Sequence, residues 1–225
     1  MNASDTIGGR IERLHEEIPA GVTLVAVSKF HPASAVMEAY EAGQRVFGES
    51  RVQEFLEKKR ELPGDIKWHF IGHLQTNKVK SVIGQTHLIE SVDSIRLLDL
   101  INKESEKAGV ITELLLQVHV AAEETKFGFF PEELQAFFAE RKYEGYGRVR
   151  IRGIMGMASN TDDSARIRED FKAIASIFRK VKELAPDPES FDILSMGMSG
   201  DWPLAIKEGS NMIRIGSAIF GQRIY

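Results

Sequence analysis

Lys29 is the residue whose type and position first suggest chemistry. It stands near the end of the apolar segment TLVAVSKF, which starts at Thr23. Because side chains alternate between the two faces of a β-strand, Val25, Val27 and Lys29 share one face. An amine at the end of an apolar row has a lowered pKa and can condense with an aldehyde to give a Schiff base. The alternative is a strand-end lysine that simply reaches solvent.

Two segments near the carboxyl terminus could hold an anion. In SMGMSGDWPLAI, Ser199 and Gly200 lie at the predicted start of a helix, where a hydroxyl meets free backbone N–H groups. In RIGSAIFG, Gly216 and Ser217 offer a second set of amides and another hydroxyl. Together the two segments would suit a phosphate group. Each feature alone has a simpler explanation, because serine often caps a helix and glycine allows close packing.

Arg214 follows the alternation of the last apolar segment, so its side chain is predicted to point inward. A buried guanidinium is costly unless it meets an acceptor or an anion. One partner would be the pyridine nitrogen of pyridoxal 5′-phosphate (PLP), an aldehyde that Lys29 could hold. That nitrogen would then stay unprotonated, and the ring would withdraw electrons less strongly. The other possible partner is a carboxylate inside the fold, such as Glu49.

The elements that must position these residues follow a simple alternation. Short segments rich in Val, Ile and Leu alternate with segments of helical periodicity, which is typical of a parallel sheet covered by helices. Predicted strands span 23–30, 45–49, 67–72, 88–92, 113–120, 150–157, 193–198 and 212–220. Predicted helices lie near 33–43, 51–61, 76–83, 94–107, 131–140, 163–184 and 201–208.

This order predicts an α/β protein with one domain over residues 1–225, a (β/α)8 barrel with an extra amino-terminal helix near 4–17. An open doubly wound sheet would show the same alternation, but eight strands favour closure. In such a barrel the functional face is formed by the carboxyl ends of the strands. We therefore expect Lys29, Ser199 and Gly216 to meet there. The segment 142–148 is predicted to be a loop.

Composition excludes several classes of function. The 225 residues carry 29 Lys and Arg against 33 Asp and Glu, so a net charge of -4 gives no general attraction to nucleic acid or anionic membranes. The absence of cysteine removes disulfides and thiolate chemistry, and it predicts a cytoplasmic location. The polar amino terminus suggests neither a signal peptide nor a membrane span. The six histidines lack convincing ligand spacing, so no metal site is expected.

Several motifs, in this order, resemble those of the PLP homeostasis protein family, small proteins related to the amino-terminal barrel of alanine racemase (fold-type III). They are AVSKFHP around Lys29, FGESRVQE at 47–54, WHFIGHLQTNK at 68–78, ESVDS at 90–94, KFGF at 126–129, SMGMSGDWPLAI and RIGSAIFG.

The resemblance implies a set of cofactor-binding residues. Lys29 would carry PLP as a Schiff base and Arg214 would face the pyridine nitrogen. The phosphate would be held by Ser199, Gly200, Gly216 and Ser217. Met155, Ser195 and Met196 would line the ring pocket, although plain packing inside the barrel explains them equally well.

Other positions in these motifs are open to two interpretations. Family members commonly have GEN where this sequence has GES, so Ser50 is a pocket candidate with a shorter reach than asparagine. Lys126 could approach the cofactor or carry PLP in transit, or it could be an ordinary solvated lysine. The residues of the HFIGHLQTNK motif could contact ligand or shape the third βα turn; they are His69, Gln75, Asn77 and Lys78.

The resemblance implies an intracellular buffer or carrier of PLP, which affects amino-acid and keto-acid balance, with PLP-dependent apoenzymes as candidate recipients. The sequence stops at Tyr225, soon after the last predicted strand, so we expect no second domain to supply a second base and no efficient catalysis. A monomer is expected. Two alternatives remain: a weak PLP-dependent racemase that uses Lys29 as its base, and a PLP-free Schiff-base lyase acting on a phosphorylated sugar.

Overall fold

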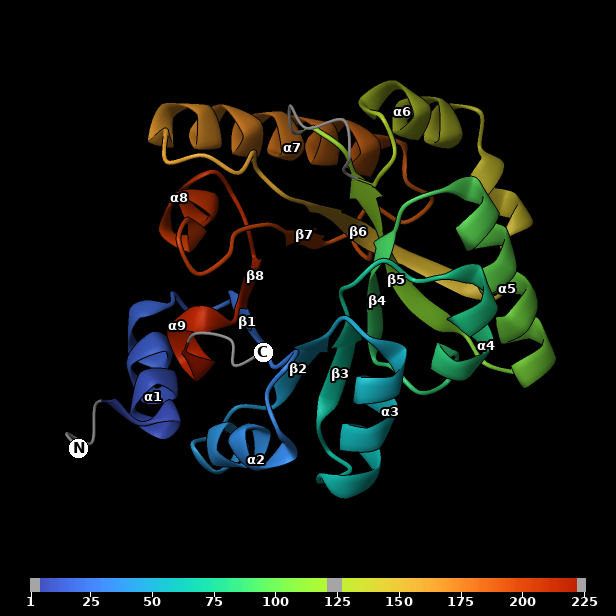
Figure 1. Ribbon diagram of the computed structural model, residues 1–225. Helices are drawn as coiled ribbons and strands as arrows, with labels where there is room; N and C mark the ends of the chain where they lie inside the picture. The colour runs from blue at the N-terminus through green and yellow to red at the C-terminus, as the bar shows by residue number, and fades with distance from the viewer. Residues whose placement is uncertain (1–4, 121–126, 222–225) are drawn as a thin grey trace.

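Eight parallel strands close into a barrel in which each strand pairs with its neighbour in sequence and β8 pairs with β1 (Figure 1). The computed structural model describes residues 5–120 and 127–221. The strands are β1 Thr23–Val27, β2 Val46–Glu49, β3 Lys67–Phe70, β4 Leu88–Val92, β5 Thr112–Val118, β6 Val149–Gly156, β7 Ile193–Ser195 and β8 Met212–Ile215. The prediction of a closed barrel is therefore confirmed.

Helices surround the barrel (Figure 1). They are α1 Ile7–Glu17, α2 Ala33–Glu41, α3 Val52–Glu61, α4 Val79–Val82, α5 Ile95–Ala108, α6 Pro131–Ala139, α7 Ser164–Leu184, α8 Trp202–Lys207 and α9 Ser217–Phe220, with 3-10 turns η2 Thr76–Lys78 and η3 Lys142–Gly145. The extra amino-terminal helix, α1, is confirmed. The segment predicted as a loop at 142–148 contains η3 instead.

Six of the eight strands end one to five residues earlier than predicted, and the errors at β1 and β8 bear on the site. The first strand ends at Val27, not Phe30, because the chain turns there and Phe30 adopts a left-handed conformation with φ 68°. The last strand ends at Ile215, and residues Ser217–Phe220 form the short helix α9 instead. Both errors fall at the carboxyl ends of strands, so Lys29 lies on a turn after β1 and Ser217 begins α9, and neither lies within a strand.

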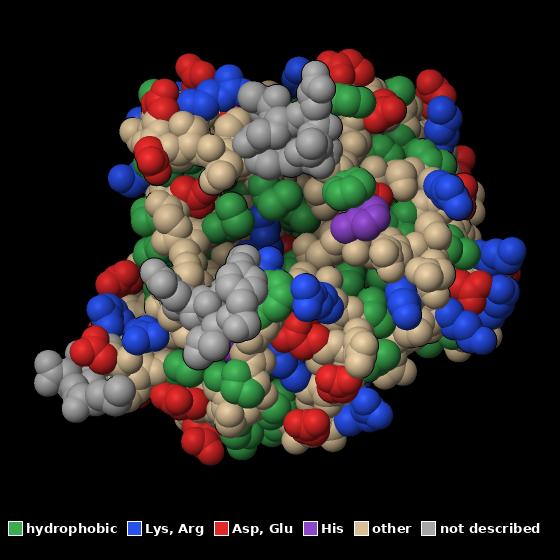
Figure 2. All heavy atoms as spheres, in the orientation of Figure 1, with side chains coloured by type: hydrophobic (Ala, Val, Ile, Leu, Met, Phe, Trp, Pro, Cys, Tyr) green, Lys and Arg blue, Asp and Glu red, His purple; other side chains and the backbone are tan. Residues whose placement is uncertain are grey.

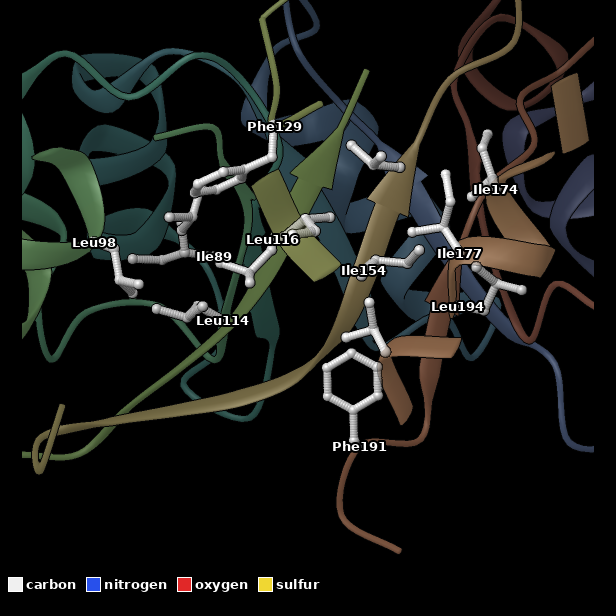
Figure 3. Close-up of a cluster of buried hydrophobic side chains, with 14 of the residues drawn as sticks. Ile89, Leu98, Leu114, Leu116, Phe129, Ile154, Ile174, Ile177, Phe191 and Leu194 are labelled. Atoms are coloured by element: carbon white, nitrogen blue, oxygen red, sulfur yellow. The ribbon is translucent and has the colours of Figure 1, made fainter. Parts of the chain in front are cut away.

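Most of the hydrophobic core lies between the barrel and its helices. Outward side chains of β4, β5, β6 and β7 pack together with side chains of α5 and α7. Figure 3 labels ten members of this cluster: Ile89, Leu114, Leu116, Ile154 and Leu194 from strands, Leu98, Ile174 and Ile177 from helices, and Phe129 and Phe191 from connecting segments. Burying a side chain of this size stabilises the fold by roughly 1.5–3 kcal/mol.

The inside of the barrel holds a smaller apolar cluster, formed by Val25, Leu88, Leu115, Met155 and Met212. Buried polar residues share this interior with the apolar cluster. In the described ranges, no helix is both long and apolar enough to cross a membrane.

Candidate functional site

A cavity of about 270 Å³ lies at the carboxyl ends of the strands. Among the residues that line it are seven of the ten predicted from the sequence: Lys29, Met155, Ser199, Gly200, Arg214, Gly216 and Ser217. Figure 2 shows a hollow on this face with Lys and Arg side chains, in blue, at its floor. The structure thus brings the predicted amine, hydroxyls and guanidinium to one place.

Lys29 follows β1 on a turn whose backbone is held on both sides. On one side, Ser28 N–H donates to the carbonyl oxygen of Gly48 at 3.1 Å, which extends the pairing with β2 by one residue. On the other side, Phe30 N–H donates to Glu54 Oε1 at 2.6 Å. Left-handed geometry at a non-glycine residue such as Phe30 costs about 1–3 kcal/mol and persists only where its surroundings impose it.

A buried charge cluster, formed by Ser28, Glu49, Glu54 and Lys58, supplies that support. Lys58 Nζ lies 2.6 Å from Glu49 Oε1 and 2.8 Å from Glu54 Oε1, and it also donates to the carbonyl oxygen of Ser28 at 2.7 Å. The Ser28 hydroxyl donates to Glu49 Oε1 at 2.7 Å. The cluster therefore fixes the residues before and after Lys29.

Ser199 connects the two segments that were predicted to hold an anion. The N–H groups of Gly216 and Ala218 both point to Ser199 Oγ, at 3.2 and 3.4 Å. Gly216 also allows a close approach, because a Cβ there would lie 3.2 Å from the carbonyl oxygen of Val27. Backbone amides and hydroxyls therefore converge on one side of the cavity.

Arg214 reaches the cavity from inside the barrel and is only 5% exposed. Its Nη1 donates to Ser195 Oγ at 2.5 Å and its Nη2 to the carbonyl oxygen of Gly156 at 3.0 Å. Its carboxylate partner is Glu90, with Nη1 3.8 Å from Oε2. The alternative prediction, a contact between Arg214 and Glu49, is wrong, because Glu49 points out of the barrel and pairs with Lys58.

Glu90 is fully buried and both of its oxygens are engaged. Oε1 lies 2.7 Å from His69 Nδ1, and Oε2 accepts from Ser195 Oγ at 2.6 Å. Burial opposes ionisation of this carboxyl, but His69, Arg214 and Ser195 together outweigh it and hold the pKa of Glu90 below its ordinary value. Arg214, Ser195, Glu90 and His69 thus form a continuous chain of contacts inside the barrel, which we call the axial network.

The sequence matches the model of the alanine racemase N-terminal domain over residues 4–224. It is 39% identical to the pyridoxal phosphate homeostasis protein of Haemophilus influenzae, over 91% of this chain and 86% of that protein. It is 38% identical to the protein of the same name from Aquifex aeolicus, over the full length of both. The chain belongs to the pyridoxal phosphate homeostasis protein family.

Solved structures agree with that assignment. PipY of Synechococcus elongatus, solved with PLP bound, is 38% identical and superposes with a TM-score of 0.88 over 96% of this chain and 100% of that one. Alanine racemase from E. faecalis shares the fold at 18% identity, with a TM-score of 0.74 over 96% of this chain and 57% of its own. The predicted alanine-racemase-like barrel is therefore confirmed.

Three predicted site residues do not line the cavity. Ser195 is fully buried and contacts the cavity-lining Arg214 through a hydrogen bond. Met196 is fully buried in the outer core. Ser50 is partly buried beside Gly72, where a Cβ would lie 2.4 Å from the Ser50 carbonyl oxygen. Lys126 lies outside the described residues.

The residues of the HFIGHLQTNK motif lie in two different environments. His69 is buried in the axial network, whereas Gln75, Asn77 and Lys78 are exposed at η2. Six further cavity-lining residues were not predicted as site residues: Val27, His31, Ile71, Met157, Met198 and Gly221. Alternation could have found Met157, which stands two residues after Met155 on the same side of the chain. His31 had no such signal; its ring stacks on Phe220 at 5.1 Å.

The residues around the cavity fit PLP, the cofactor that the family implies. An amine is present for the aldehyde, and two backbone N–H groups already converge on one hydroxyl oxygen, as they would on a phosphate oxygen. Arg214 offers a donor for a ring nitrogen, and Val27, Ile71 and Met155 provide apolar surface for ring faces. The described residues contain no group of three or more metal-type ligands.

Proposed function

We propose that this chain binds PLP, with Lys29 as the residue that forms a Schiff base with the aldehyde and releases one water molecule. The single observation that supports this most strongly is that one cavity is lined by Lys29, by Arg214, and by the Ser199 hydroxyl with two amides directed at it. In this proposal Ser199, Gly200, Gly216 and Ser217 bind the phosphate, and residues 1–225 act as one PLP-binding domain.

The contacts of Arg214 support storage rather than catalysis. A permanently charged guanidinium beside the pyridine nitrogen keeps that nitrogen unprotonated, and an unprotonated ring is a weaker electron sink for carbanion chemistry. We propose that the protein buffers or carries PLP in the cytoplasm, which limits a reactive aldehyde and affects amino-acid and keto-acid balance. PLP-dependent apoenzymes as recipients, and a monomeric state, are part of the same proposal.

The visible absorption spectrum of purified protein loaded with PLP tests the covalent site. We expect a band near ~420 nm for a protonated Schiff base, and borohydride reduction should place the pyridoxyl group on Lys29. Lys29→Ala should lose the band, and Lys207→Ala, which removes an exposed lysine on α8, should keep it. An adduct on another lysine in the wild-type protein would refute the assignment. Lys126→Ala then asks whether that residue takes PLP transiently.

Exchange of the α-proton of alanine in deuterated buffer tests the proposed lack of efficient catalysis. A carrier should exchange this proton no faster than free PLP does at the same concentration. Exchange that is fast, saturable and abolished by Lys29→Ala would instead establish a racemase-like activity.

A further inference from the structure

A second cavity, of about 330 Å³, opens at the opposite end of the barrel from Lys29. It lies where the strands begin, and its wall includes Lys67, His69 and His87 together with Glu113, Arg152 and Asp192. None of these residues lines the proposed PLP cavity. We call it the amino-end cavity.

The carboxylates of the amino-end cavity are already neutralised. Arg152 bridges Glu113 at 2.8 Å and Asp192 at 2.9 Å, and Arg150 binds the other oxygen of Glu113 at 2.9 Å. Two guanidinium groups therefore balance two carboxylates. Arg150 itself does not line the cavity. Lys67 is exposed at the wall and forms no ion pair with any residue in 5–120 or 127–221, so its charge is left without a paired carboxylate.

His69 provides the buried donor that an anion would need. The residue is only 2% exposed, and its Nδ1 is engaged by Glu90 at 2.7 Å. Its Nε2 has no hydrogen-bond partner among the described residues, although the residue lines the cavity. The Glu90 carboxylate favours a proton on His69 Nδ1, where it accepts a hydrogen bond. A second proton on Nε2 makes Nε2 a donor to a ligand in the cavity.

The second imidazole has the same positive surroundings. His87 stacks on His69 with ring centroids 5.7 Å apart. Burial, followed by the charges of His69 and Lys67, lowers the pKa of His87, with Glu113 opposing and Arg152 adding to the effect. An anion placed among these groups would relieve their mutual repulsion.

We propose that the amino-end cavity binds a small oxyanion, with His69 Nε2–H and Lys67 as its donors. The shared chemistry is that of inorganic phosphate and of the carboxylate of a small acid. With Nδ1 engaged by Glu90, a donating Nε2–H makes His69 an imidazolium, and this imidazolium contacts the same carboxylate, Glu90, that faces Arg214. An anion at one end of the barrel is thereby connected through the axial network to the guanidinium at the other end.

Binding is measured on protein without PLP by titrating inorganic phosphate and, separately, pyruvate, at constant ionic strength, while following the ring signals of ¹⁵N-labelled histidines. We expect a saturable shift of the ring signals of both His69 and His87. The signals of His73, which pairs with Asp93 near the other end of the barrel, should not move. A shift with phosphate alone identifies a tetrahedral anion, and one with pyruvate alone identifies a carboxylate.

Two matched variants decide whether the site is specific. Lys67→Met should raise the apparent dissociation constant by about fivefold, whereas Lys103→Met, the same change at an exposed lysine of α5, should leave it unchanged. His69→Gln should remove saturable binding if the variant folds. The proposal is overturned if neither anion gives a saturable shift at His69, or if both lysine variants weaken binding equally, since that would indicate general charge screening.

The proposed effect of the anion on Arg214 rests on the proposed function, and a separate measurement tests it. Adding the anion to PLP-loaded protein should shift the visible band in the wild type and not in Lys67→Met. A histidine shift without any change in the visible band would establish the anion site and refute the effect on Arg214. Failure of the protein to bind PLP would refute the proposed function and leave the histidine titration valid.

Discussion

Two buried charge clusters flank the proposed PLP cavity, and they differ in how their carboxylates are satisfied. In the axial network, inside the barrel, the donors to Glu90 are divided between its two oxygens. In the Lys58 cluster, outside the barrel, Ser28 and Lys58 both bind Oε1 of Glu49, and Oε2 is buried without a hydrogen bond to any described residue. Similar side chains in similar burial thus meet different hydrogen-bonding environments.

The consequence of this difference appears in the pKa values. The pKa of Glu90 lies below its ordinary value although the carboxyl is fully buried. Burial instead raises the pKa of Glu49, in spite of the neighbouring Lys58. Burial favours the neutral form of both carboxyls, so what differs is how many donors oppose it and where they lie. The comparison indicates that Glu90 is a fixed charge that balances Arg214, and that Glu49 can take up a proton.

Removing the charge of Glu90 should have the largest effect. Glu90→Gln leaves the guanidinium of Arg214 buried without its counter-charge, and breaking a buried pair in this way costs about 3–5 kcal/mol. Urea unfolding at neutral pH measures the loss. Glu57→Gln, the same change at an exposed site on α3, should change stability little. Equal effects of the two substitutions would show that Glu90 does not balance Arg214.

Removing Lys58 should cost less, because Glu49 can respond by protonation. Lys58→Met should destabilise the fold by about 2–3 kcal/mol and slow the capture of PLP, since the turn that carries Lys29 loses the contact at Ser28. The double variant Lys58→Met with Glu49→Gln should recover part of the stability. No recovery in the double variant would mean that packing of the lysine stem, and not the charge of Glu49, accounts for the loss.

The sequence predicted the cavity better than it predicted the two networks. Lys29, Ser199 and Gly216 stand at the carboxyl ends of strands, and the barrel geometry alone brings such positions together. The partner of a buried charge depends on whether each side chain points into or out of the barrel. Phe47 packs in the outer core, so Glu49, two residues later, also points outward, while Glu90 follows the inward Leu88. Applying alternation to every strand would have placed Glu90 inside the barrel, among the candidate partners of Arg214.

Strand ends are where alternation stops being informative. The change from strand to turn after Val27 depends on Phe30 adopting a left-handed conformation, which is imposed by Glu54 on a different element. Local sequence preference does not contain this long-range contact. The same limit applies to α9, whose start is tied to Ser199 by two hydrogen bonds that span a long stretch of the sequence.

The dependence of stability on pH should separate the two carboxyls. Because the folded pKa of Glu49 is raised above its ordinary value of 4.5, its stabilising contribution is complete below that value and is lost as the pH rises through the folded pKa. The folded pKa of Glu90 is lowered, so its contribution is present above 4.5 and is lost as the pH falls through the folded pKa.

Urea unfolding from about pH 4 to about pH 7.5 tests these opposite signs. Glu49→Gln, which resembles the protonated form, should gain stability relative to the wild type as the pH rises. Glu90→Gln should be most destabilised at neutral pH and approach the wild type in acid. If the free energy of unfolding of both variants changes with pH as that of the wild type does, neither carboxyl titrates as proposed.

The smallest effect is expected at Ser195, which joins Arg214 to Glu90. Ser195→Ala leaves Arg214 and Glu90 in place but removes the hydroxyl that accepts from one and donates to the other, which should cost about 1–3 kcal/mol. The direct Arg214–Glu90 separation of 3.8 Å is too long for a strong hydrogen bond, so the hydroxyl completes the contact. Ser195→Thr, which keeps the hydroxyl, should retain more of the PLP affinity than Ser195→Ala in a spectroscopic titration. If both variants lose affinity equally, the space occupied by the side chain, and not its hydroxyl, determines how Arg214 is held.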